Sequence, residues 1–164
     1  MDRLETLRHV IDEILHQHPD LEERRAGFVH LNGLSVICAL LALKREMDPQ
    51  LCAVMGMLHD IASYKTGDPT NHAPRSVREA QKILNEIDGF SPGEINTICT
   101  AISTHSAKDK IDGTLAELLK DADVLQHYFY DPTLVWKSSI HWQQRVNNTL
   151  VELALPPHQK GEIS

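Results

Sequence analysis

Apolar residues recur at intervals of three and four along almost the whole chain, and this spacing limits the fold more than any other feature. The first residues already show it, with Leu4, Leu7, Ile11 and Leu15 at such intervals. Residues spaced in this way fall on one face of an α-helix. No convincing strand, glycine-rich phosphate loop or internal repeat interrupts the pattern. The sequence therefore predicts an all-α fold, a single-domain bundle of about six to seven helices.

Caps and breakers divide this pattern into segments. Asp48-Pro49 and Ser91-Pro92 read as helix starts, 66–71 reads as a loop, and Asp131-Pro132 as a break. The third helix should carry His59 and Asp60 at its far end. We expect one domain over 1–164, with its core at about 25–130, a C-terminal helix at 138–153 and a frayed tail at 156–164. The other helices are expected at about 4–18, 20–45, 49–60, 74–87, 92–105 and 114–130.

Composition narrows the classes of function. The chain has 164 residues and a net charge of -7, and no cluster of Lys and Arg that would follow a phosphate backbone. General nucleic-acid binding is therefore not expected. No run approaches the roughly 18 apolar residues of a membrane span, and the first residues lack the layout of a signal peptide. Three cysteines without a CxxC pair favour reduced, buried thiols. We expect a cytoplasmic protein without a membrane partner.

The apolar run at 51–58 ends abruptly at His59-Asp60. Burying an imidazole or a carboxylate without a partner costs several kcal/mol. A metal ion is the simplest partner that satisfies both groups. Adjacent residues diverge by about 100° on a helix, so the pair can share a metal only where the helix ends and the backbone turns.

Other candidate ligands fall at helix ends or inside apolar helical segments. Asp121 and Asp123 lie about 200° apart on one helix, so at most one can face a shared cavity. The apolar neighbours of Asp123 favour it, while Asp121 can be solvated. With His59 and Asp60, the candidate ligands are His30, His72, His105 and Asp123. The remaining histidines are interpreted as core or surface residues: His9, His16, His18, His127, His141 and His158.

His30, then His59-Asp60 behind an apolar helix, then Asp123 within Ala122–Leu125, resembles the HD-domain superfamily of metal-dependent phosphohydrolases. The resemblance covers about residues 25–130. It implies that His30, His59, Asp60 and Asp123 are metal ligands. His72 and His105 resemble the two added histidines of subfamilies that hold two metals, with Asp60 as the bridge. The chain departs from many relatives at 61–65, where they carry a small residue and a nearby Gly-Lys.

The resemblance implies a small phosphorylated substrate, such as a nucleotide, hydrolysed by a metal-activated water. Asp60 and His59 are the expected catalytic residues. The cofactor would be a divalent transition metal, with two ions per chain, and Mn, Fe, Co, Ni and Zn all remain open. Candidate phosphate contacts are Lys65, Arg75, Lys108 and Lys110, although Lys108 and Lys110 can equally be solvated loop charges.

Two alternatives remain open at this point. Some HD-domain proteins are di-iron oxygenases, and the expected ligand set does not distinguish them from hydrolases. The protein can also be a non-catalytic module that binds a metal or a nucleotide, although six candidate ligands without a cysteine favour an open site over a structural zinc site. Trp136 and Trp142 are interpreted as core residues or as a dimer face, and a homodimer stays an open alternative.

Overall fold

The computed structural model describes residues 2–133 and 137–157. This part of the chain forms eight helices and no strand, which confirms the all-α fold. Trp136, His158 and the expected frayed tail from 158 onward lie outside the described residues. The helices are α1 (Arg3–Gln17), α2 (Leu21–Lys44), α3 (Pro49–Leu58), α4 (Ile61–Thr66), α5 (His72–Glu86), α6 (Pro92–Thr104), α7 (Thr114–Tyr130) and α9 (Ile140–Glu152).

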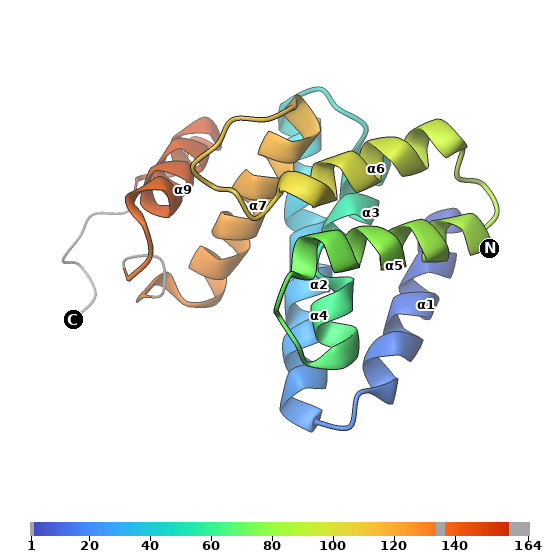
Figure 1. The fold of residues 1–164 in the computed structure, drawn as a ribbon. Helices are drawn as coiled ribbons and strands as arrows, with labels where there is room; N and C mark the ends of the chain where they lie inside the picture. Colours follow the sequence, from blue (N-terminus) through green and yellow to red (C-terminus); the bar gives the residue numbers. More distant parts are fainter. Residues whose placement is uncertain (1, 134–136, 158–164) are drawn as a thin grey trace.

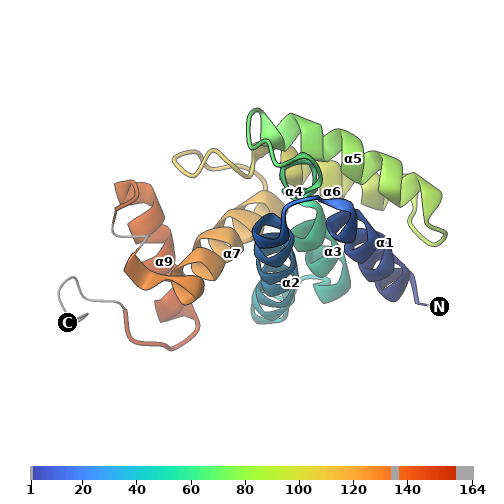
Figure 2. The same cartoon turned by 90° about the horizontal axis from the view of Figure 1, so that it is seen from below.

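Helix α2 runs through the middle of the molecule and packs against both α3 and α7 (Figure 1). Helices α5 and α6 pair with each other, and α5 also contacts α4. Seen from below, α1 and the N-terminus lie at one end of the molecule and α9 at the other (Figure 2). The main core joins α1 to α7, whereas a small second cluster lies between α7 and α9 and is formed by Val124, Leu125, Val146 and Leu150.

Side-chain caps fix where several helices begin. The carboxylate of Asp20 accepts hydrogen bonds from the amides of Glu22 and Glu23 at the start of α2. Asp48 caps α3 in the same way, and Ser91 with Glu94 forms a reciprocal capping box on α6. These side chains satisfy amides that have no partner within their own helix. The starts of α2, α3 and α6 therefore follow directly from the sequence.

The largest difference from the expected helices lies around the His-Asp pair. Helix α3 ends at Leu58, and the short helix α4 begins at Ile61. Asp60 takes φ -120° and ψ 16°, outside helical geometry, so the chain turns between the two helices. The loop after α4 contains two residues with positive φ, Gly67 and Asn71, types that tolerate this conformation. After that turn α5 begins at His72, two residues before the expected start at about 74.

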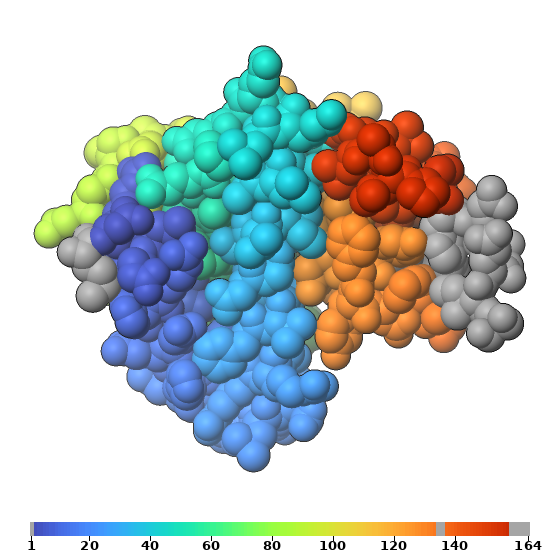
Figure 3. All heavy atoms as spheres, turned by 180° about the vertical axis from the view of Figure 1, so that it is seen from behind, coloured from blue at the N-terminus to red at the C-terminus, as the bar shows by residue number. Residues whose placement is uncertain are grey.

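Helix α2 is long and apolar enough to cross a membrane by length and composition alone. Core helices of globular proteins pass the same test, and α2 has its own packing partners in α3 and α7. The space-filling view from behind shows the outer face of α2 between α1 on one side and α7 with α9 on the other (Figure 3). The inner face carries His30 and most of the apolar core contacts of this helix.

Gly56 sets the close approach of α3 to α2, and this yields a first prediction. A Cβ atom at this position would lie 3.1 Å from Cys38 Sγ and 3.1 Å from the backbone oxygen of Leu34. Because backbone cannot yield as a side-chain tip does, Gly56→Ala should lower the free energy of unfolding by about 1–3 kcal/mol in urea denaturation. Gly93→Ala is the matched control, since its Cβ would meet nothing closer than 3.9 Å. Equal stability of the two variants would contradict the prediction.

Candidate metal centre

The turn between α3 and α4 brings two adjacent side chains to one point. His59 still has helical dihedrals, but Asp60 does not, and the two side chains point toward each other. His59 Nε2 lies 3.3 Å from Asp60 Oδ2. The geometric condition for a shared metal, a helix that ends at the pair, is therefore present in the structure.

Four histidines from different elements turn the same ring nitrogen inward. Each has a hydrogen bond between its Nδ1 and an acceptor behind the ring, and an outer partner of this kind fixes the tautomer of a metal-binding histidine. The Nε2 atom is thereby left as the free acceptor, facing the centre. The acceptors are Gln126 Oε1 for His30 (2.7 Å), Gly56 O for His59 (2.9 Å), Pro69 O for His72 (3.1 Å) and Ile102 O for His105 (2.7 Å).

Asp60 lies between two groups of these histidines. Its Oδ1 is 3.2 Å from His105 Nε2 and 3.7 Å from His72 Nε2. Its Oδ2 is the atom that faces His59, and His59 Nε2 is in turn 3.1 Å from His30 Nε2. One carboxylate thus contacts ligand-type nitrogens on both sides.

Asp123 supplies the second carboxylate from inside α7. Its Oδ1 lies 3.6 Å from His30 Nε2 and 3.9 Å from His59 Nε2. Its Oδ2 accepts a hydrogen bond from the ammonium of Lys108 at 2.5 Å. Asp121, by contrast, points away from the centre and pairs with Arg45 and Arg145. It is therefore held by two guanidinium groups rather than only by solvent.

Two buried carboxylate oxygens in this cluster receive no hydrogen bond within the part of the chain that the structure describes. Asp60 Oδ1 and Asp123 Oδ1 are both buried without a hydrogen-bond partner among the described residues. The facing Nε2 atoms of His30 and His59 likewise bring two acceptors together. Buried polar groups in native proteins nearly always have a partner, and a cation between these atoms would satisfy all of them. The residues present therefore fit a divalent metal.

The protonation states of His30, His105 and the two carboxylates agree with this fit, whereas the pKa of His59 is raised because Asp60 and Asp123 outweigh the effect of its burial. Burial lowers the pKa of His30 to about 4 and also lowers that of His105, so both rings are neutral near pH 7. Burial acts to raise the pKa of Asp60, but His59 and His105 outweigh it and hold that pKa well below its usual range. Asp123 is held low in the same way, by Lys108 and His59 against burial. Neutral imidazoles and ionised carboxylates are the forms that bind metals.

Comparison with known families decides the relationship. The HD domain matches residues 27–127, well over half of the chain. The chain belongs to the HD-domain family. Neither the curated proteins nor the solved structures gave a match. Members of this family are commonly metal-dependent hydrolases, and the HD pair of the motif coincides with the turn described above.

Two cavities flank the HD-domain centre, one on each side of Tyr64. The first has a volume of about 290 Å³ and is lined by Glu23, Asp60, Ser63, Tyr64, Gly67, Pro69 and His72. The second, of about 210 Å³, is lined by Ala26, Val29, His30, Tyr64, Gln126, His127 and Tyr130. Most side chains that line the first cavity are polar, whereas the surface of the second is mainly apolar or aromatic. Both give access to candidate ligands.

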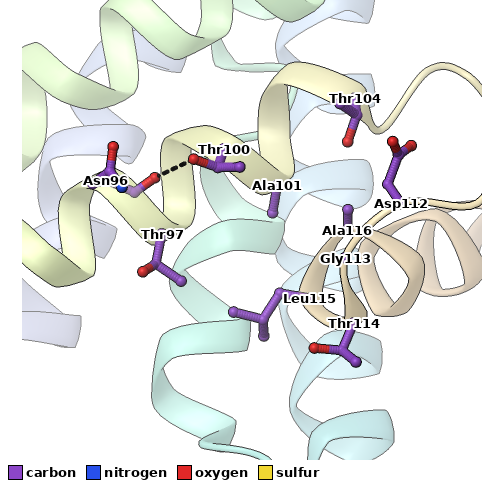
Figure 4. Close-up of a pocket in the computed structure, with 10 residues that line it drawn as sticks. All are labelled: Asn96, Thr97, Thr100, Ala101, Thr104, Asp112, Gly113, Thr114, Leu115 and Ala116. Atoms are coloured by element: carbon purple, nitrogen blue, oxygen red, sulfur yellow. Dashed lines mark hydrogen bonds between the residues drawn. The ribbon is translucent and has the colours of Figure 1, made fainter.

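A third cavity lies away from these histidines, between α6 and the start of α7 (Figure 4). Its volume is about 380 Å³, and threonines form much of its wall. The one carboxylate that lines it, Asp112, accepts a hydrogen bond from Lys120. No histidine lines it, so it does not offer the ligand set of the HD centre.

Of the candidate phosphate contacts Lys65, Arg75 and Lys108, only Lys108 lies at the centre. Lys65 forms an ion pair with Glu79, and Arg75 binds the 66–70 loop through Asp68, so both are engaged outside the centre. Lys108 is buried, and its ammonium also donates to the backbone oxygen of His105 at 2.8 Å. It is thus a charge inside the site rather than a solvated loop residue.

Sequence reasoning missed His127. The sequence favours a core or surface role for this residue, whereas in the structure its Nε2 lies 3.5 Å from Asp123 Oδ1. The spacing of four residues from Asp123 places both on one face of α7, and this is the pattern that should have drawn attention to it. Gln126, which holds His30, was likewise missed, because nothing in the sequence marks its partner.

Proposed function

We propose that the protein hydrolyses a small phosphorylated substrate at a centre of two divalent metal ions. One observation carries the proposal. Asp60 and Asp123 each have a buried carboxylate oxygen that faces histidine nitrogens and receives no hydrogen bond from the described residues. The proposed metal ligands are His30, His59, Asp60, His72, His105 and Asp123.

The position of Asp60 supports two metals rather than one. Its two oxygens face different histidines: Oδ2 faces His59, whereas Oδ1 faces His105 and His72. A carboxylate placed in this way is suited to bridge. His30, His59 and Asp123 then belong to one metal, and His72 with His105 to the other.

Divalent ions held here would lower the pKa of bound water to about 7 and offset the negative charge of a phosphoryl group. The chain itself orients the ligands. Asp60 stays ionised, and its side chain is 22% exposed on the open side of the centre. Lys108 holds Asp123 in place through its Oδ2. The Lys108 ammonium donates to Asp123 Oδ2 and to the backbone oxygen of His105, and Lys108 is the proposed phosphate contact because it is a positive charge beside the centre.

The polar cavity beside Asp60 and His72 is the proposed substrate site. His72 is 30% exposed, whereas His59 and His105 are almost fully buried, so the cluster opens on this side. The hydroxyl of Ser63 and the carboxylate of Glu23 line the same cavity and can bind hydroxyl groups of a substrate. Its volume of about 290 Å³ suits a small molecule.

The test combines metal analysis with phosphate release. Protein loaded with Mn²⁺ or Co²⁺ should hydrolyse p-nitrophenyl phosphate or its bis-ester, and chelation should abolish the reaction. In His72→Ala we expect one metal ion fewer per chain and activity reduced at least about tenfold. Even the loss of a residue that only hydrogen-bonds to a metal ligand lowers metal affinity or activity by about 10–100-fold.

His9→Ala is the matched control, since His9 is an exposed histidine on α1, and it should retain full metal content and rate. Oxygen consumption by iron-loaded protein without phosphate release would contradict the proposal. Hydrolysis that persists after complete chelation would contradict it equally.

A further inference from the structure

His127 lies beside the proposed metal centre but is not one of its six ligands. It projects from α7 one turn after Asp123, and its Nε2 is 3.5 Å from Asp123 Oδ1. Its ring centroid is 4.8 Å from that of His30. The ring thus lies beside His30 and Asp123, next to the cavity shared with Tyr64 and Tyr130.

The atoms around this ring have the composition of a ligand set. His30, Asp123 and His127 each offer a donor atom within 4.8 Å of the other two. The oxygen between them, Asp123 Oδ1, is one of the two buried carboxylate oxygens without a hydrogen-bond partner. Two imidazoles and an unpaired carboxylate oxygen are a typical set for a divalent transition metal.

The position of the ring is supported from behind. Trp142 of α9 packs against it, with the ring centroids 5.4 Å apart. Trp142 belongs to the apolar cluster between α7 and α9, and α9 lies outside the stretch matched by the HD domain. The His127 side chain is 35% exposed, so it is held against the centre by Trp142 while still bordering a cavity. This support is a feature of this chain's own C-terminal helix.

We propose that His127 is a seventh protein ligand, which binds the same metal as His30 and Asp123; this rests on the proposed metal centre. Five side chains then surround that metal: His30, His59, Asp60, Asp123 and His127. The metal beside His72 and His105 keeps the open positions. The substrate is therefore bound from the cavity at Asp60 and His72, and the cavity at Tyr130 is not the route to the phosphoryl group.

The competing role for His127 is a substrate contact from the Tyr130 cavity. Both roles predict lower activity when the ring is removed, so turnover alone does not separate them. A ligand changes the affinity and the visible absorption spectrum of bound Co²⁺ in the absence of substrate, because the spectrum depends on coordination number and geometry. A substrate contact changes KM and leaves that spectrum unaltered.

The experiment is a Co²⁺ titration of metal-free protein, followed by absorption and calorimetry, with wild type, His127→Ala, His127→Gln and His9→Ala. We expect both His127 variants to bind one of two Co²⁺ ions at least about tenfold more weakly, with an altered spectrum, while His9→Ala matches wild type. Imidazole added to His127→Ala should restore the wild-type spectrum by filling the vacated space, which also shows that the variant is folded.

Unchanged Co²⁺ affinity and spectrum in both His127 variants would overturn the seventh ligand. Asp60→Ala distinguishes the two levels of failure. If Asp60→Ala loses Co²⁺ and the His127 variants do not, only the role of His127 is wrong. If wild type binds no Co²⁺, the metal centre and its seventh ligand fall together.

Discussion

Asp60→Ala should lose both metal ions and all measurable phosphohydrolase activity while the helical fold is retained. Asp60 is the one described side chain whose two oxygens face histidines of both groups, at 3.2–3.7 Å. Its removal therefore takes a ligand from each metal, in contrast to His72→Ala, which affects one. We expect a fall in kcat/KM of at least about a hundredfold, since loss of a ligand at each of two positions multiplies two penalties of about 10–100-fold.

The measurement pairs elemental analysis with phosphate release and circular dichroism. Asp88→Ala is a suitable control, because Asp88 is an exposed aspartate in the turn before α6. An Asp60→Ala protein that retains two metals and full turnover would refute the proposed centre.

The His-Asp pair and its four companions were predictable because each has a local mark. The apolar run before His59 predicts a buried helix. The polar pair at its end needs a partner, because burying it alone costs free energy. The capped starts at Asp48 and Ser91 fix the helices that carry His59 and His105. Order along the chain then supplied the resemblance to the HD family. The structure brings all six side chains into one cluster, while their role as ligands stays a proposal.

The directions of the charged side chains were not predictable in the same way. Lys65, Arg75 and Lys108 all follow or precede candidate ligands by a few residues, but only Lys108 enters the site. The difference comes from tertiary partners: Glu79 on α5 holds Lys65, and Asp68 holds Arg75. A single sequence does not show which partner a long side chain will find. The burial of Lys108 depends on Asp123 of α7, 15 residues later, and on Arg145 of α9, 37 residues later.

A network of charges on α7 and α9 explains how the loop with Lys108 is held. Arg145 of α9 donates to the backbone oxygens of Lys108 and Lys110 and pairs with Glu117 and Asp121. The loop thus depends on α9 for its position. This helix contributes Arg145 to the loop and Trp142 to His127, so an element outside the matched HD domain supports the proposed metal centre at two points.

Lys120 is the fully buried cation of this network, with 0% of its side chain exposed. Its ammonium donates to the backbone oxygen of Lys110 and pairs with Asp112 at 2.5 Å and Glu117 at 3.0 Å. The sequence gives no hint of this, because Lys120 simply follows two leucines in an amphipathic helix. Its stem fills apolar space while its head ties the loop from Lys108 onward to α7.

Lys120→Met should therefore lower the free energy of unfolding by about 3 kcal/mol, since it leaves Asp112 without its cation and Glu117 with Arg145 alone. Methionine keeps most of the apolar stem, so the decrease in the free energy of unfolding comes from the lost charge and not from a cavity. Urea denaturation measures it, with Lys82→Met at an exposed position of α5 as control. Because the loop carrying Lys108 is released, activity should fall in the folded fraction as well. A variant as stable as the control would show that the network is replaceable by apolar packing, as happens when a buried ion pair costs as much in desolvation as it gains.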